Sequence, residues 1–154
     1  MSICESILSL NVRGLRDSTK RREIFRWLKN LHNGTNSIIF LQETHSIDKD
    51  IAKWEHEWGS KIIMSHGTSN SRGVAILFPN CLNFAIKDYS FDINSRIIFP
   101  LLSNAETVYC LINVYSPTQD QEKEQLDFLD NIQVIIDENL DKQIIMGGEF
   151  NLYL

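Results

Sequence analysis

The 154-residue chain has few cysteines and no long apolar run, and each shortage excludes a class of protein. Its three cysteines, Cys4, Cys81 and Cys110, are widely spaced and form no C-x-x-C pair, which argues against a disulfide framework and against structural zinc. The longer apolar runs, such as residues 108–112, are far below the roughly 18 residues that cross a bilayer, and the N-terminus has no secretory signal pattern. We therefore expect an intracellular protein without a membrane-spanning segment.

Basic charge is also in short supply. The formal net charge is -5, whereas proteins that hold nucleic acid through bulk electrostatics usually carry a basic face. One basic cluster stands out near the N-terminus, and it consists of Arg13, Arg16, Lys20, Arg21, Arg22, Arg26 and Lys29. A solvated helix face is the simpler interpretation of this cluster, so an anionic substrate has to be recognised by local groups.

What the sequence does contain is the composition of one globular domain, with 43% hydrophobic and 23% charged residues. Helical spacing of apolar residues predicts helices at about 19–31, 46–59 and 121–140. Short apolar runs between polar or Gly/Pro breaks predict strands at 6–12, 37–41, 61–65, 74–78, 82–89, 96–102, 107–115 and 143–146. The mixture predicts an α/β protein in which the short middle connections favour antiparallel neighbours.

The apolar positions of two helices predict which side of each helix faces the core. In the first helix the three- and four-residue spacing selects Ile24, Trp27, Leu28 and Leu31. In the last helix the corresponding stripe consists of Leu126, Leu129, Ile132, Ile136 and Leu140. We expect both stripes to be buried.

Polar side chains lie at the carboxyl ends of four predicted strands, where α/β proteins bind their ligands. Glu43 and Glu149 are hard oxygen ligands of the kind that Mg²⁺ prefers, and the glycines at 147 and 148 would let the backbone approach a ligand closely. Asn11, Tyr115 and Asn151 can orient a phosphate or a water molecule by hydrogen bonds. If the four strands lie side by side, these groups converge on one site; alternatively, each polar residue only marks where its strand leaves the core.

Five motifs occur in the order seen in the exonuclease-endonuclease-phosphatase superfamily. They are Asn11-x-x-Gly14, Leu41-Gln42-Glu43-Thr44, Gly73-Val74-Ala75-Ile76-Leu77, Asn113-Val114-Tyr115-x-Pro117 and Gly148-Glu149-Phe150-Asn151. The chain most closely resembles the apurinic/apyrimidinic-type endonuclease domain that opens the proteins of non-LTR (LINE-type) retrotransposons. The resemblance runs over residues 1–154 and corresponds to the N-terminal half of such a domain, which we expect to be truncated here.

The resemblance implies hydrolysis of a phosphodiester, with Mg²⁺ or alternatively Mn²⁺ as cofactor and DNA as the ancestral substrate. In such enzymes the residues that match Glu43 and Asn11 organise the metal. The tyrosine that matches Tyr115 contacts the scissile phosphate, and the asparagine that matches Asn151 holds it. Arg13 lies in the same loop as Asn11 and is a further candidate for contact with substrate phosphate.

Two departures from the family pattern predict weak or absent activity. Glu149 stands where the family has the aspartate that aligns or deprotonates the attacking water, and a displacement of about 1 Å can cost on the order of a hundredfold in rate. The second departure is that a further metal-site aspartate and a terminal Ser-Asp-His motif, which the family carries in its second half, have no counterpart in this sequence. We expect His45 and His66 to be surface or loop histidines rather than substitutes.

The resemblance also predicts the architecture and possible partners. Because the superfamily folds as a four-layer sandwich, we expect half of a four-layer α/β sandwich, with one mixed, mostly antiparallel sheet and helices on one face. The uncovered face of that sheet would favour self-association or a protein partner. Action on genomic DNA would require a nuclear location. Two alternatives remain open: a non-catalytic remnant that only binds nucleic acid or protein, and a phosphatase of the same superfamily.

Overall fold

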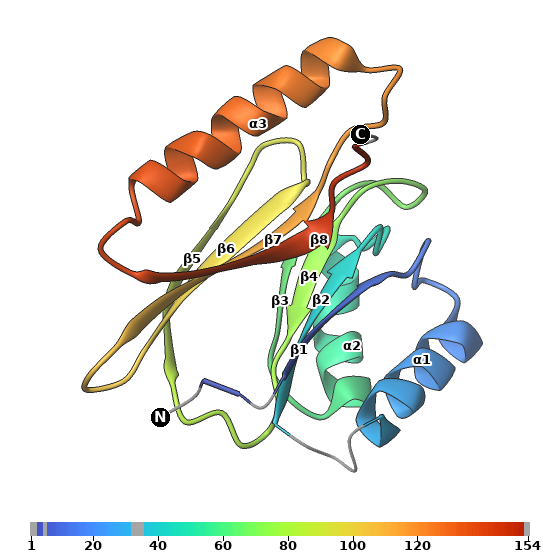
Figure 1. Ribbon diagram of the computed structural model, residues 1–154. Coiled ribbons are helices and arrows are strands. Elements are labelled where there is room, and N and C mark those ends of the chain that lie inside the picture. The colour runs from blue at the N-terminus through green and yellow to red at the C-terminus, as the bar shows by residue number, and fades with distance from the viewer. Residues whose placement is uncertain (1–2, 5, 32–35, 153–154) are drawn as a thin grey trace.

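The computed structural model describes residues 3–4, 6–31 and 36–152, and these residues form two four-stranded sheets packed face to face (Figure 1). The first sheet has the strand order β1-β2-β4-β3, with bounds Ser6–Asn11, Ser37–Gln42, Val74–Leu77 and Ile62–Ser65. The second has the order β5-β6-β7-β8, with bounds Ala85–Phe91, Ile97–Ser103, Val108–Tyr115 and Gln143–Glu149. In each sheet one pair is parallel, β1 with β2 and β7 with β8, and the other pairs are antiparallel.

Helices cover both outer faces of this pair of sheets. The first sheet is covered by α1 (Ser18–Asn30) and by α2 (Ile51–Trp58), which follows a short 3₁₀ turn at Asp48–Asp50, while α3 (Glu122–Asp137) lies across the second sheet (Figure 1). The side chain of Asp17 accepts a hydrogen bond from the Lys20 N–H and caps α1, as expected for this residue. None of the described helices is long and apolar enough to cross a membrane.

The predicted α/β class is confirmed, but the prediction of a single sheet with helices on one face is wrong. The strands divide because their apolar residues occupy both faces: Phe40 and Ile76 point to the inner core, whereas Ile39 and Leu77 point to the helices. The inner face of the first sheet is covered by the second sheet, through residues such as Ile98. Neither sheet therefore has the uncovered face that was expected to attract a partner.

The buried side of α1 also differs from the prediction. Phe25 and Leu28 are buried together with Arg21, whereas Trp27 and Leu31 are 50% and 40% exposed. Arg21 turns inward because Glu57 of α2 receives two hydrogen bonds from it, at 2.5 and 3.0 Å. Because this guanidinium is buried together with its carboxylate partner, the buried side of α1 is rotated relative to the stripe predicted from the apolar spacing.

In α3 the buried side is rotated in the same way. Phe128, Ile132 and Ile135 pack against the second sheet, whereas Leu126 and Leu129 are 57% and 40% exposed. Of the predicted stripe, Ile132 is buried and Ile136 is partly buried against the same cluster. The aromatic ring of Phe128, which the predicted stripe omitted, belongs to the buried side, and burying this large side chain favours the observed rotation of the helix.

Candidate active site

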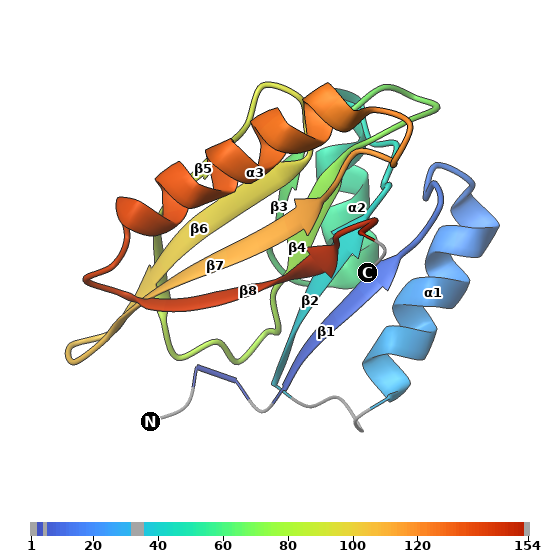
Figure 2. The same cartoon turned by 45° about the horizontal axis from the view of Figure 1, so that its top comes forward.

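The carboxyl ends of β1, β2, β7 and β8 meet at one end of the molecule, as Figure 2 shows from the positions of their arrowheads. Two of these strands come from each sheet, and β1 lies against β8 where the sheet edges meet. Polar side chains that are far apart in the sequence are therefore brought together across the sandwich. This is the convergence that the strand-end pattern predicted.

Asn11 links the two predicted carboxylates. Its Nδ2 donates to Glu43 Oε1 at 2.7 Å and also to Glu149 Oε2. An amide NH₂ group has only two hydrogens, so both donors of Asn11 are used by carboxylates. The carboxylate of Glu149, at the end of β8, thus reaches the amide of Asn11 at the end of β1.

Tyr115, at the end of β7, completes this group. Burial raises its pKa to about 12, and the charge of Glu43, a hydrogen bond to Glu43 and the charge of Glu149 act in the same direction. The phenol therefore remains protonated at neutral pH and can act as a hydrogen-bond donor. Three residues predicted from separate motifs, Glu43, Tyr115 and Glu149, share one electrostatic environment with Asn11.

Arg96 lies behind Tyr115 and was not identified from the sequence. Its guanidinium is 5.3 Å from the centre of the Tyr115 ring, it donates to the Tyr115 carbonyl at 3.5 Å, and it forms an ion pair with Glu124 of α3 at 3.7 Å. Burial, and then the nearby charge of Arg72, lower the pKa of Arg96. In the sequence, Arg96 is only an arginine directly before the apolar strand β6. A charged residue in that position is usually exposed to solvent.

The two histidines that were expected to be loop residues occupy different positions. His45 Nε2 lies 3.7 Å from Glu43 Oε2, so it contacts the candidate site, and its ring packs over Gly14. His66 instead contacts Ser46 through Nδ1 at 3.0 Å. It helps to hold the loop that follows Glu43 and lies outside the group of carboxylates.

The two residues expected to contact phosphate lie at the margin of the group. Arg13 is exposed, and its backbone N–H donates to Asn11 Oδ1 at 3.0 Å. Asn151 Nδ2 donates to the Ser116 carbonyl at 2.9 Å, which ties it to the loop after β7 rather than to the carboxylates. Their roles toward phosphate remain predictions.

The backbone at this end of the sandwich is strained. Arg13, Glu43, His45 and Asn151 all have positive φ, at 46°, 54°, 54° and 46°. Residues other than glycine pay an energetic cost for this conformation, which persists where the surrounding structure imposes it and is concentrated at functional sites. The strain therefore supports the assignment of this end as the site.

The glycines before Glu149 are required by the packing of the sandwich, and their role in the approach of a ligand stays a prediction. Gly148 has φ 137°, and a Cβ atom there would lie 2.0 Å from the Val114 carbonyl oxygen of the neighbouring strand. At Gly147 a Cβ would lie 3.3 Å from the ring of Phe40 in the other sheet. The two glycines let β8 lie close to β7 and to the facing sheet.

A buried polar bridge holds the two sheets in register directly behind the site. Asn113 of β7 is fully buried, accepts a hydrogen bond from Gln42 Nε2 at 2.9 Å and donates to the carbonyls of Leu41 and Ala75 at 3.0 and 2.8 Å. Gln42 precedes Glu43, and Asn113 lies two residues before Tyr115. The bridge therefore relates the positions of two site residues that come from different sheets.

We expect Asn113→Ala to lower the free energy of unfolding by about 3 kcal/mol, because it leaves buried hydrogen-bonding groups without partners. Urea unfolding followed by circular dichroism measures this loss. Ser9→Ala is the matched control. It removes an exposed hydroxyl that accepts a hydrogen bond from Gln42 Nε2 at 3.1 Å, and we expect the free energy of unfolding to fall by less than about 1 kcal/mol. Equal losses in the two variants would contradict a special role for the bridge.

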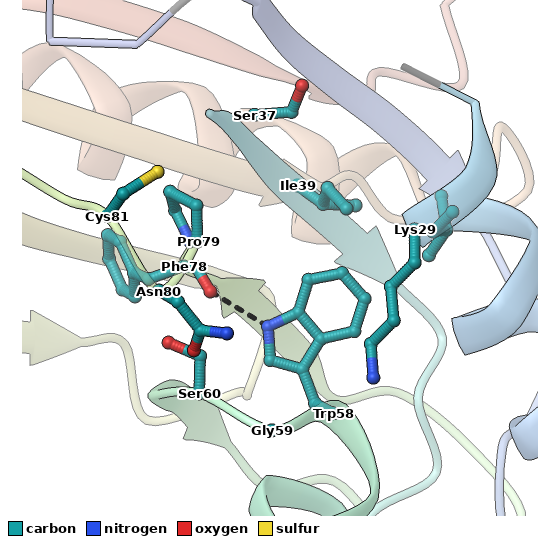
Figure 3. A pocket seen from close by; sticks show the side chains of 11 residues that line it. Lys29, Ser37, Ile39, Trp58, Gly59, Ser60, Phe78, Pro79, Asn80 and Cys81 are labelled. Atoms are coloured by element: carbon teal, nitrogen blue, oxygen red, sulfur yellow. Dashed lines mark hydrogen bonds between the residues drawn. The ribbon is translucent and has the colours of Figure 1, made fainter. Parts of the chain in front are cut away.

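A separate apolar hollow of about 290 Å³ lies at the opposite end of the first sheet (Figure 3). The indole of Trp58 lines it and donates to the Phe78 carbonyl at 2.8 Å, and Lys29 and Cys81 stand at its margins. Among the described residues, no aspartate or glutamate lines this hollow. It lacks the carboxylates and the strained loops of the strand-end site, so we assign it no catalytic role.

The side chains at the strand ends suit a hard divalent cation. The described residues contain no group of three or more His, Cys, Asp or Glu side chains placed to hold a metal ion. Mg²⁺, however, is commonly bound by one or two carboxylates and completes its shell with water and substrate phosphate. Glu43 and Glu149, which flank the single amide of Asn11, match that requirement.

Comparison with known proteins gives a relative and a fold. The chain matches the Endonuclease/Exonuclease/phosphatase family over residues 8–153. It is 31% identical over 150 residues to the Transposon TX1 uncharacterized 149 kDa protein of Xenopus laevis, a match that covers 97% of this chain and 11% of that protein. The predicted resemblance to this superfamily and to a retrotransposon protein is thereby confirmed.

Solved structures share the fold at low sequence identity. An AP endonuclease from Archaeoglobus fulgidus matches with a TM-score of 0.70 and 22% identity, over 95% of this chain and 57% of that chain. TDP2 from D. rerio, complexed with single strand DNA product, matches with a TM-score of 0.71 and 16% identity, over 96% of this chain and 61% of that chain. The chain thus spans only part of the length of each of these proteins. The match over residues 8–153, together with the identity to the TX1 protein, shows that the chain belongs to the Endonuclease/Exonuclease/phosphatase family.

Proposed function

We propose that the strand-end site binds Mg²⁺, with Mn²⁺ as an effective substitute, and is a phosphodiesterase site of the retrotransposon-endonuclease type, with DNA as its ancestral substrate and with weak or absent activity in this chain. The observation that carries the proposal is the convergence of Glu43, Glu149 and Tyr115 around the amide of Asn11. A metal bound there would act as a Lewis acid and stabilise charge on the phosphate oxygens. Acting on genomic DNA, the protein would work in the nucleus.

Each residue has a proposed role that follows from its surroundings. Glu43 and Asn11 would hold the metal, and Glu149 would orient or deprotonate the attacking water. The protonated phenol of Tyr115 would donate a hydrogen bond to the scissile phosphate, where fixed donors stabilise the developing charge. Arg13 and Asn151, at the margin of the group, would hold the phosphates of the strand.

A specific observation also supports a second candidate, a remnant that binds metal and nucleic acid but hydrolyses little. Both amide hydrogens of Asn11 are taken by carboxylates, so no donor of this residue remains for a phosphate oxygen. Glu149 takes one of the two amide hydrogens because its side chain, longer than that of an aspartate, reaches the amide. We therefore propose that the 154-residue chain binds metal but nicks DNA weakly or not at all.

Two measurements on the same preparation test this proposal. Titration with Mn²⁺ followed by electron paramagnetic resonance should detect one bound ion, and Glu43→Gln should weaken binding by at least about tenfold because it removes a charged ligand. Glu106→Gln, an exposed residue in the turn between β6 and β7, is the control and should leave binding unchanged. Absence of metal binding by the native chain would refute the assignment of the site.

Nicking of supercoiled plasmid, with Mg²⁺ or with EDTA, tests the catalytic part. We expect little or no EDTA-sensitive nicking by the native chain. Rapid metal-dependent nicking that Glu43→Ala abolishes would show that the site is fully active and would contradict the remnant. Turnover of small phosphorylated molecules without nicking would instead favour a phosphatase.

A further inference from the structure

Arg96 and Tyr115 form a cross-strand pair at the active-site end of the second sheet. The antiparallel register of β6 and β7 places Ile97 opposite Val114, so the next pair along the ladder is Arg96 with Tyr115. The Tyr115 N–H donates to the Arg96 carbonyl at 2.7 Å and so continues the ladder to this pair. Side chains that lie opposite each other on one face of a sheet are close enough to interact. The fold therefore brings the guanidinium of Arg96 against the ring of Tyr115.

The side chain of Tyr115 is held at two points. The Arg96 guanidinium lies 5.3 Å from the centre of the phenol ring and donates to the Tyr115 carbonyl at 3.5 Å. A planar guanidinium stacks on an aromatic face in a way that a lysine ammonium cannot. At the far end of the ring the hydroxyl forms a hydrogen bond with Glu43. Contact on the ring face together with this hydrogen bond sets the direction of the phenol.

Arg96 is itself held at both ends. Asp92 Oδ1 accepts hydrogen bonds from the backbone N–H groups of Arg96 and Ile97, both at 2.7 Å, and these fix the start of β6. The guanidinium forms an ion pair with Glu124 of α3 at 3.7 Å, and only 8% of the Arg96 side chain is exposed. A long side chain that is buried and held in this way has lost most of its rotamer freedom. Arg96 therefore gives the ring of Tyr115 a fixed support.

A direct contact between Arg96 and a substrate phosphate is the alternative role. The guanidinium borders a polar hollow of about 350 Å³, which is also lined by Arg72 and by the carboxylates of Asp92, Glu124 and Asp127. Three carboxylates against two guanidinium groups leave this hollow without a positive excess that would attract a phosphate. The charge of the hollow and the burial of Arg96 both favour a role that is exerted through Tyr115.

We propose that Arg96 is a positioning residue, which holds the ring of Tyr115 so that the phenol points into the site and donates to the substrate phosphate, without touching the phosphate itself. The inference rests on the proposed function, because the hydrogen bond that Arg96 supports is the one proposed for Tyr115. Replacing Arg96 should therefore cost no more affinity for DNA than the loss of the Tyr115 hydroxyl costs.

A double-mutant cycle of DNA binding tests this indirect role. A short fluorescently labelled DNA duplex, titrated in the presence of Mg²⁺ and followed by anisotropy, reports affinity without requiring cleavage. We expect Tyr115→Phe to weaken binding about tenfold, because it removes a hydrogen bond to a charged group. Arg96→Met should weaken binding by up to about tenfold in the native chain, but by less than about twofold in a chain that carries Tyr115→Phe. Losses that multiply in the double variant would show a direct contact with phosphate and overturn the proposal.

Two controls separate positioning from loss of charge and from general disruption. Arg26→Met removes a positive charge from an exposed position of α1 and should change the affinity for the duplex by less than about twofold. Arg96→Met should retain the Mn²⁺ affinity of the native chain, because the proposed metal ligands are unchanged. A loss of Mn²⁺ binding in Arg96→Met as large as that in Glu43→Gln would show a general structural role and overturn the proposal.

The position of the Tyr115 ring tests the proposal without DNA. In a crystal structure of Arg96→Met we expect the ring to have left the place that it occupies beside Arg96 in the native chain. Should Arg96→Met not fold, Arg96→Lys keeps the charge but not the planar group, and we expect the same displacement. A ring in its native position in the variant crystal would overturn the proposal. Failure of the proposed function would appear differently, as absence of Mn²⁺ binding by the native chain.

Discussion

The variant Glu149→Asp is expected to nick plasmid DNA about 100-fold faster than the native chain under single-turnover conditions with Mg²⁺. The reason is the reach of the side chain. Glu149 extends to the amide of Asn11 and uses one of its two hydrogens, while Glu43 uses the other. Shortening the side chain by one methylene withdraws the carboxylate and returns that donor to the substrate.

Two controls make this result interpretable. Glu106→Asp shortens an exposed glutamate in the turn before β7, at the end of that strand opposite to Tyr115, and should not change the rate. The double variant Glu43→Gln, Glu149→Asp should fall back to background, which would show that the added nicking belongs to this site. A rate for Glu149→Asp equal to that of the native chain would mean that the geometry of Glu149 does not limit activity.

The second large effect is expected from Gly148→Ala, which should lower the free energy of unfolding by roughly 3 kcal/mol or more. The new Cβ atom would lie 2.0 Å from the carbonyl oxygen and 2.8 Å from the nitrogen of Val114, on a backbone with φ 137°. Neither strand can relax without breaking the parallel pairing of β7 and β8. Urea unfolding midpoints of the purified variants measure the change.

Gly59→Ala is the matched control because it imposes a positive φ without a clash. Gly59 has φ 85°, and a Cβ there would meet only Lys29 Nζ, at 3.9 Å. We expect a loss of about 1 kcal/mol, the ordinary cost of the left-handed conformation. If the two variants lose the same stability, the contact between Gly148 and Val114 is not what makes glycine necessary.

The convergence of the candidate site residues could be predicted from the sequence, whereas the number of sheets could not. Asn11, Glu43, Tyr115 and Glu149 could be found because each ends an apolar run, and strand ends converge in α/β proteins. The number of sheets could not be found in this way. A strand such as β2 is apolar on both faces, so its sequence shows that both faces are covered. It does not show whether helices or a second sheet cover the inner face.

Long-range partners account for the other errors. Arg21 lies in a basic run and was expected to be solvated with its neighbours, but Glu57, thirty-six residues later, gives it a buried partner. Arg96 likewise becomes part of the site only because β6 pairs with β7 and brings it beneath Tyr115. Local spacing carries no information about such pairs, and the helix stripe that it predicts is displaced when a charged residue is buried.

The division into two sheets follows the order of synthesis. All four strands of the first sheet and both of its helices come from residues 6–77, whereas the second sheet is built from residues 85–149. Each sheet therefore finds its hydrogen-bonding partners within one continuous stretch of chain, and the first can assemble before the second leaves the ribosome. Until then its inner face, including Phe40 and Ile76, remains exposed, so the nascent chain passes through a stage that is prone to aggregation.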